Sequence, residues 1–132
     1  MNDLEKMTNR AKESMQSAAQ MAEDAGHPNV EPEHLLYAVL SQEGSSVNDI
    51  LTQKGAKVAD IENALKKALD KMPQVRGHRL VAGPRLVNLF ETAKSISKKM
   101  GDEYVANEHF WLAAYEGDSA LKGVLAQSAV GK

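Results

Sequence analysis

Residues 26–34 read Gly-His-Pro-Asn-Val-Glu-Pro-Glu-His, and residues 101–109 read Gly-Asp-Glu-Tyr-Val-Ala-Asn-Glu-His. The two stretches share a glycine, a valine and a Glu-His pair at one constant offset, the 75 positions from Gly26 to Gly101. Each glycine follows a run with helical periodicity, and glycine commonly ends a helix because it enters the left-handed conformation at little cost. Each Glu-His pair opens an apolar run. The chain therefore contains an internal repeat in which one helix ends and the next begins.

Further positions coincide when the second half is laid over the first. At the same offset Arg10 falls on Arg85, Ala18 on Ala93 and Ala38 on Ala113, and with one residue fewer Ile50-Leu51 and Gln53 fall on Val124-Leu125 and Gln127. The repeat predicts two similar helical halves, related by a pseudo-two-fold axis and meeting across a shared groove.

The fold class is predicted to be all-α. The chain is rich in good helix formers and poor in aromatic residues, and apolar residues recur in steps of three and four. The first helical face is predicted to start in the opening residues, at Leu4, Met7, Ala11, Met15, Ala18, Ala22 and Ala25. The first half has about four helices. The second ends after its third, around Leu121, Val124 and Leu125, so a counterpart of the Val58–Met72 helix is expected beyond Lys132.

The predicted organisation is a single domain over residues 1–132. Repeat one covers residues 1–73 and repeat two covers residues 84–132. Periodicity disappears between them, from Gln74 to Gly83, and this stretch is predicted to be a linker.

Composition excludes several classes of function. The net charge of −2 favours neither nucleic acid nor an anionic membrane as a partner, and no apolar run approaches the roughly 20 residues that span a bilayer. The chain has no cysteine, and its polar start is unlike a signal peptide, so a cytoplasmic protein is expected. Because the phosphate-loop and Gly-x-Ser-x-Gly motifs are absent, no catalytic residue and no cofactor are predicted within this chain.

Several of these segments resemble the Clp N-terminal repeat domain, over essentially the whole chain. They are Leu4–Ala11, Gly26-His27, the run Glu33–Leu36 and its echo Glu108–Phe110. Gln42–Val47, Met72–Val75 and Gly101-Asp102 look most like the ClpB-type AAA+ disaggregases. The resemblance implies a stress-response chaperone domain that captures unfolded or aggregated polypeptide weakly. The AAA+ rings of the same chain would then thread that polypeptide, using ATP and Mg in a full-length hexamer, whereas the isolated domain would be a monomer.

The resemblance also implies site residues. The family's substrate surface falls on Thr8, Asp102 and Glu108, with Phe90 at an adjoining hydrophobic groove and His109 at its edge, where the family often has an aliphatic residue. By its position alone Thr8 would be an exposed helical residue, and Phe90 lies on an inward face, so burial in the core is an alternative for it.

The two Glu-His pairs allow more than one interpretation. A glutamate in the first turn complements the helix dipole while the histidine packs nearby, or the glutamates Glu33 and Glu108 bind a ligand. No metal site is predicted, because neighbouring residues on a helix point about 100° apart and no His-Glu-x-x-His spacing is present.

Two alternative functions follow from the same family. In its ClpC branch the matching glutamates recognise phosphorylated arginine, which suggests an adaptor-docking or phosphoarginine-binding domain of a protease-linked unfoldase. Pro32 and Asn107 stand where that branch commonly has threonine. The other alternative is a free-standing structural partner of a Clp complex.

Overall fold

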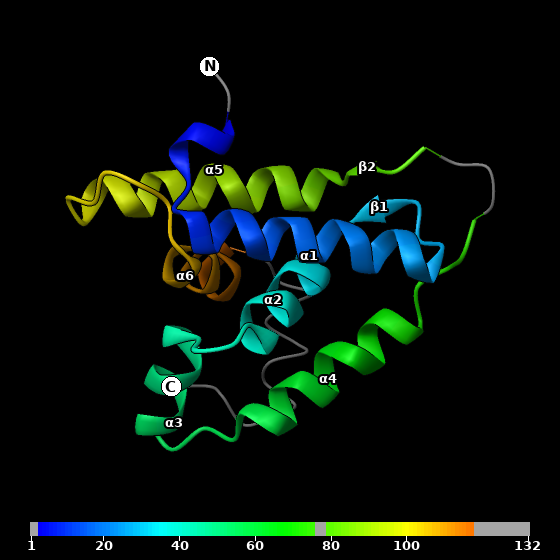
Figure 1. The fold of residues 1–132 in the computed structure, drawn as a ribbon, viewed down its shortest axis with the longest axis horizontal. Helices are drawn as coiled ribbons and strands as arrows, with labels where there is room; N and C mark the ends of the chain where they lie inside the picture. The colour runs from blue at the N-terminus through cyan, green and yellow to red at the C-terminus, as the bar shows by residue number, and fades with distance from the viewer. Residues whose placement is uncertain (1–2, 76–78, 118–132) are drawn as a thin grey trace.

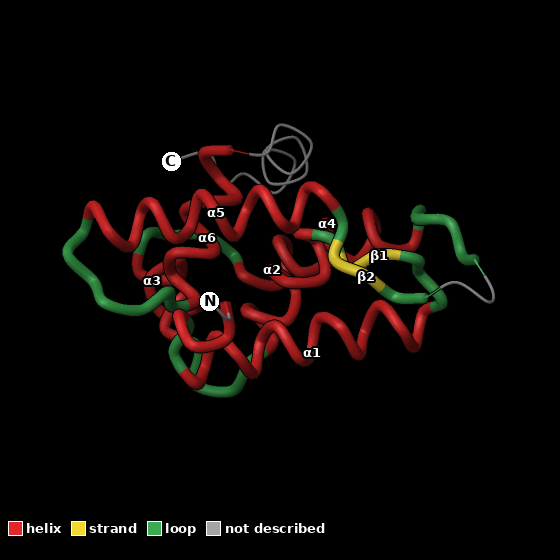
Figure 2. The backbone as a smooth tube through the Cα atoms, turned by 90° about the horizontal axis from the view of Figure 1, so that it is seen from above, coloured by secondary structure: helices red, strands yellow, loops and turns green. Residues whose placement is uncertain are grey.

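The computed structural model describes residues 3–75 and 79–117 (Figures 1 and 2). Its elements in chain order are the 3₁₀ turn η1 (Asp3–Lys6), α1 (Asn9–Ala25), β1 (Asn29–Val30), α2 (Pro32–Ser41), α3 (Ser46–Gln53), α4 (Val58–Asp70), β2 (Val81–Ala82), α5 (Pro84–Lys99) and α6 (Asn107–Gly117). The described part is helical apart from two-residue strand contacts, which confirms the all-α prediction. The third helix expected in repeat two lies outside the described residues.

The helices form layers, and α2 and α6 make up the middle one. In Figure 1, α1 and α5 run in opposite directions across the top, α2 and α6 lie beneath them, and α3 and α4 are lowest. Helix α2 is buried nearly all round, with Leu35, Leu36 and Val39 inaccessible to solvent. On the inner face of α1, the small side chains of Ala11, Ala18 and Ala22 are fully buried. Their size lets α1 approach the core closely.

The helix boundaries follow the expected local chemistry, with one correction. Gly26 and Gly101 end α1 and α5 with φ of 75° and 77°, and Pro32 and Pro84 stand in first turns, where the missing N–H costs nothing. The helical face predicted from Leu4 was wrong, because α1 begins only at Asn9. Met7 instead pairs with Val105 in a parallel bridge, which holds the preceding backbone out of the helix.

The strand contacts show how the two repeats are related. Strand β1 pairs with β2 in parallel, placing Val30 opposite Ala82, and the isolated bridge places Val105 opposite Met7. Val105 and Ala82 are the repeat counterparts of Val30 and Met7. The valine that follows the first helix of one repeat thus pairs with the residue that precedes the first helix of the other, as a two-fold relation requires. Ala82 lies in the stretch predicted as a linker, so the correspondence between the halves extends into the end of that stretch.

Candidate functional site

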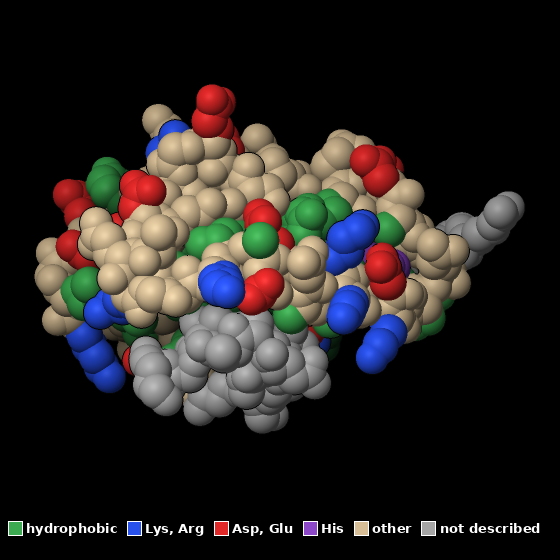
Figure 3. Space-filling view, turned by 90° about the horizontal axis from the view of Figure 1, so that it is seen from below, with side chains coloured by type: hydrophobic (Ala, Val, Ile, Leu, Met, Phe, Trp, Pro, Cys, Tyr) green, Lys and Arg blue, Asp and Glu red, His purple; other side chains and the backbone are tan. Residues whose placement is uncertain are grey.

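A groove of about 500 Å³ lies between α3 and α6, and therefore between the two repeats. Its lining is mostly apolar and includes two acidic residues: Val47, Ile50, Leu51, Lys54, Met100, Asp102, Glu108, His109, Trp111, Leu112 and Tyr115. Ile50 is 43% exposed and Met100 58% exposed, which is unusual for large apolar side chains. Figure 3, which shows the molecule from below, shows that hydrophobic side chains reach the surface among acidic and basic ones.

Asp102 and His109 are joined at the edge of this groove. The Nδ1 atom of His109 accepts the backbone N–H of Ala106 at 2.8 Å, so a neutral His109 carries its proton on Nε2. Nε2 lies 2.8 Å from an Asp102 carboxylate oxygen. His109 is only 3% exposed, whereas the Asp102 side chain is 47% exposed. His109 is therefore held in place, and Asp102 is the member of the pair that faces solvent.

Glu108 occupies the first turn of α6 and is partly exposed. Its counterpart in repeat one, Glu33, is 4% exposed and receives two hydrogen bonds from the Arg85 guanidinium, at 3.2 and 3.0 Å. The counterpart of Arg85 is Arg10, which donates to the backbone carbonyl of Glu43 instead. Among residues 3–75 and 79–117, Glu108 forms no ion pair. The two predicted ligand-binding glutamates therefore differ, because Glu33 already holds a guanidinium of its own chain.

The Gln42 side chain bridges the two repeats close to Glu108. The Gln42 side-chain amide donates to the backbone carbonyl of Arg10 at 3.0 Å and accepts from the Asn107 side chain at 2.8 Å. This amide links α1 to the start of α6 beside Glu108.

Thr8 and Phe90 lie outside the groove. Thr8 is the N-cap of α1, its hydroxyl accepting the Ala11 N–H at 3.1 Å, and its own N–H donates to the Val105 carbonyl. Phe90 is 6% exposed, and its ring centroid lies 6.3 Å from that of Phe110. Of the predicted site residues, the structure brings Asp102, Glu108 and His109 together at the groove. Contact of Thr8 or Phe90 with a bound chain stays a prediction.

The apolar lining residues, among them Ile50, Trp111, Leu112 and Tyr115, were not among the predicted site residues. Their helical spacing marks them as an apolar face, but spacing does not show which apolar face remains uncovered. In repeat one, α4 packs against α2, where Tyr37 is the counterpart of Leu112. Both side chains are partly exposed, but Tyr37 faces the cavity between α2 and α4, whereas Leu112 faces the groove between the two repeats.

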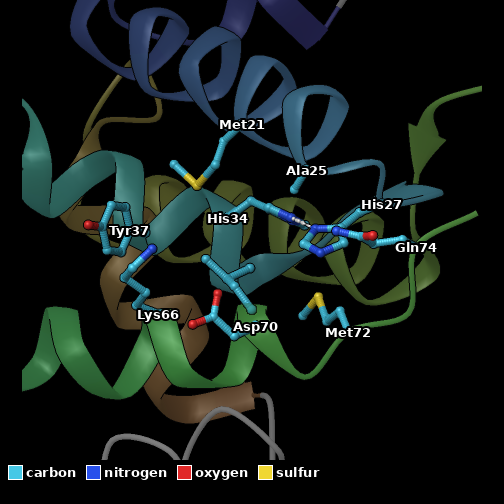
Figure 4. Close-up of a pocket in the computed structure, with 10 residues that line it drawn as sticks. Met21, Ala25, His27, His34, Tyr37, Lys66, Asp70, Met72 and Gln74 are labelled. Atoms are coloured by element: carbon cyan, nitrogen blue, oxygen red, sulfur yellow. Dashed lines mark hydrogen bonds between the residues drawn. The ribbon is translucent and has the colours of Figure 1, made fainter.

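A second cavity of about 270 Å³ lies in repeat one between the end of α1, α2 and α4 (Figure 4). His27 and His34 meet there, with Nδ1 of His27 2.8 Å from Nε2 of His34. Burial and the neighbouring His27 lower the pKa of His34 to about 4. Tyr37, Lys66 and Asp70 also line the cavity. In the described part of the chain, no group of three or more His, Cys, Asp or Glu side chains is placed to hold a metal ion.

None of the described helices has both the length and the apolar character needed to cross a membrane.

Comparison with known proteins gives a consistent result. The sequence profile described as "Clp repeat (R) N-terminal domain" matches residues 6–128. The chaperone protein ClpB of Bdellovibrio bacteriovorus is 38% identical over 127 residues, which cover 94% of this chain and 15% of that protein. The chain thus spans about a seventh of that relative's length.

Solved structures share the fold. The Hsp104 N-terminal domain from Candida albicans superposes with a TM-score of 0.84 at 20% identity, covering 93% of this chain and 81% of that one. A complex of the ClpV N-domain with a VipB peptide gives a TM-score of 0.81 at 23% identity, covering 98% and 80%.

Proposed function

The chain belongs to the Clp repeat N-terminal domain family, and from this premise we propose that it is the polypeptide-capturing domain of an ATP-dependent protein disaggregase. The observation that carries this proposal is the open apolar groove between the repeats, with Asp102 and Glu108 on its rim. The AAA+ rings that bind ATP and Mg, their hexameric assembly and the cytoplasmic location belong to the same proposal, which the name of the ClpB relative supports.

The groove suits weak capture of apolar segments. Exposed apolar patches on soluble domains cover roughly 300–600 Å², and burying such an area contributes about 7–15 kcal/mol at about 25 cal/mol per Å². Loss of translational and rotational freedom costs about 4–15 kcal/mol. With both quantities near the middle of their ranges, the difference is only a few kcal/mol. This corresponds to micromolar or weaker affinity, which lets a bound client be released to the next step.

The acidic rim adds a preference for basic residues in the client. Arg85 and Glu33 show how a glutamate in this first-turn position accepts a guanidinium through two hydrogen bonds. Glu108 has the equivalent position at the mouth of the groove, and Asp102 is nearby on the same rim. We expect apolar segments that carry an arginine to bind more tightly than neutral ones.

The related ClpV N-domain, which has been solved with a VipB peptide, supports a role in binding polypeptide. The test is a titration of the domain with a permanently unfolded, reduced and alkylated test protein, followed by backbone NMR shifts. Ile50→Ser combined with Met100→Ser should weaken binding about 30-fold, since each removes roughly 1 kcal/mol of apolar contact. Val87→Ser is the matched control, because Val87 is 49% exposed and lies outside the groove. Equal binding by all three proteins would contradict the proposal.

A second candidate function is recognition of phosphorylated arginine for a protease-linked unfoldase. The partly exposed Glu108 carboxylate favours it, whereas Glu33 is already bound by Arg85. Titration with free phosphoarginine distinguishes the two functions: binding that Glu108→Ala abolishes, without any binding of the unfolded test protein, would support this candidate.

A further inference from the structure

The His27–His34 pair has no role in the proposed groove, yet its hydrogen bonds fix where every ring proton lies. The backbone N–H of Glu31 can only donate, and it points to Nδ1 of His34 at 2.9 Å. Nδ1 of His34 is therefore unprotonated, and the neutral ring carries its proton on Nε2. That Nε2–H faces Nδ1 of His27 at 2.8 Å, so Nδ1 of His27 is an acceptor. Either ring can take up a second proton only by losing one of these two bonds.

Repeat two makes the same bond with a different acceptor. Its histidine, His109, accepts the Ala106 N–H and donates to Asp102. Asp102 is the repeat counterpart of His27. A carboxylate stays an acceptor well below pH 6, whereas an imidazole in water is protonated near pH 6.5. The hydrogen bond from His109 to Asp102 in repeat two is therefore resistant to mild acid, whereas the bond from His34 to His27 in repeat one is sensitive to it.

The turn that contains His27 holds both ends of the predicted linker. The Gly26 carbonyl accepts the Val75 N–H at 2.9 Å, and the Val30 carbonyl accepts the Gly83 N–H at 3.0 Å. The equivalent turn of repeat two has an additional anchor, because the Ser97 hydroxyl lies 3.2 and 3.1 Å from the Asp102 and Tyr104 carbonyls. The counterpart of Ser97 is Ala22, which has no hydroxyl. The turn over residues 26–30 therefore depends more heavily on its histidine.

We propose that the His27–His34 hydrogen bond is an acid-sensitive latch, which holds the backbone at Val75 and Gly83 to the 26–30 turn while both rings are neutral and loosens it when either ring is protonated. The other titratable groups that line the cavity are Tyr37 on α2 and Lys66 and Asp70 on α4 (Figure 4). From α1, the cavity is lined by Met21 and Ala25, which carry no charge. Lys66 opposes a second positive charge in the cavity and Asp70 favours one.

Amide hydrogen exchange at pH 7.5 and 5.5 tests the latch, after correction for the intrinsic exchange rates. The Val75 and Gly83 amides report on repeat one, and Thr8, which donates to the Val105 carbonyl, reports on repeat two. The pKa of His34 is about 4 while its hydrogen bonds are intact and near 6.5 once they are broken. The equilibrium constant for opening of the 26–30 turn should therefore be about 10-fold larger at pH 5.5 than at pH 7.5. We expect the Val75 and Gly83 amides to lose protection by this factor, and the Thr8 amide to change less than about 2-fold.

Reciprocal exchange of the two acceptors provides the controls. His27→Asp gives repeat one the acceptor of repeat two and should remove the acid response of Val75 and Gly83. Asp102→His should confer a response on Thr8. Ring ¹⁵N shifts of the unmodified protein give an independent check that holds even if a variant does not fold, because His27, His34 and His109 should all carry protons on Nε2 alone at pH 7.5. A proton on Nδ1 of His34, or equal loss of protection in both repeats, would overturn the latch.

Discussion

Replacing Arg85 by alanine should destabilise the domain far more than the same change at its repeat counterpart, Arg10. Arg85 holds Glu33 through two hydrogen bonds, and the Glu33 side chain is only 5% exposed. Removing the guanidinium leaves a buried carboxylate without its cation. Breaking a fully buried pair costs about 3–5 kcal/mol, and because the Arg85 side chain is 36% exposed, we expect about 2–3 kcal/mol here. Arg10 donates to an exposed carbonyl, so its loss should cost under about 1 kcal/mol.

The assay is urea unfolding at pH 7.5 of the parent protein, Arg85→Ala, Arg10→Ala and Glu33→Gln, with the double variant Glu33→Gln/Arg85→Ala to complete a cycle. In the Glu33→Gln background the buried charge is gone. Arg85→Ala should therefore lower the free energy of unfolding by at least about 1.5 kcal/mol less there than in the parent protein. In thermal unfolding the single Arg85→Ala variant should lower Tm by about 10 °C, at roughly 4 °C per kcal/mol for a domain of this size. Equal destabilisation by the two arginine variants, or additivity across the cycle, would show that Glu33 does not depend on Arg85.

Three further outcomes are expected. The pKa of His34 lies near 4 in the folded state, below the ordinary 6.5, so the unfolded state binds more protons below pH 6.5. The free energy of unfolding should therefore be unaffected by His34 above pH 6.5 and should fall by ~2 kcal/mol by pH 5. Urea unfolding measures this fall, and His34→Gln should give a flatter pH profile. Thr8→Ala should cost about 1 kcal/mol because the N-cap hydroxyl is lost, whereas Thr8→Asp should retain the cap; if client binding also survives in Thr8→Asp, the effect of Thr8 on capture is one of stability. Gly101→Ala should cost about 1 kcal/mol through its φ of 77° alone, since no atom lies within 4 Å of the added methyl group; a neutral result would mean that the turn relaxes.

The repeat and the helix ends could be predicted from the sequence because they depend on local chemistry. Gly26, Pro32 and the Glu33-His34 pair act through backbone preferences that neighbouring residues reveal. The start of the first helix could not be predicted in this way. Met7 fits the helical spacing, but its partner Val105 is remote in the chain and draws residue 7 into a bridge. A tertiary contact overrode a local pattern there.

The groove was only partly predictable for a related reason. Asp102, Glu108 and His109 came from resemblance to a family, and the structure places all three in the lining of one groove. The apolar part of the groove depends on how α3 of repeat one lies against α6 of repeat two. Spacing identifies the buried face of each helix but does not show where two faces meet incompletely. The different pairing of Glu33 and Glu108 was also hidden, since Arg10 and Arg85 are identical in sequence.

The differences between the repeats explain why the open site lies on α6. Positions that both halves share, such as Gly26 and Gly101 or His34 and His109, make the same backbone contacts twice and maintain the frame. The halves differ at two positions of these helices: Leu36 and Leu40 are buried in α2, whereas their counterparts Trp111 and Tyr115 in α6 are larger and partly exposed. Aromatic side chains bring a large contact area at low cost in conformational entropy. Duplication therefore supplied a stable frame with two equivalent helices, and divergence of one of them allowed an exposed apolar groove without removing the contacts on which the fold depends.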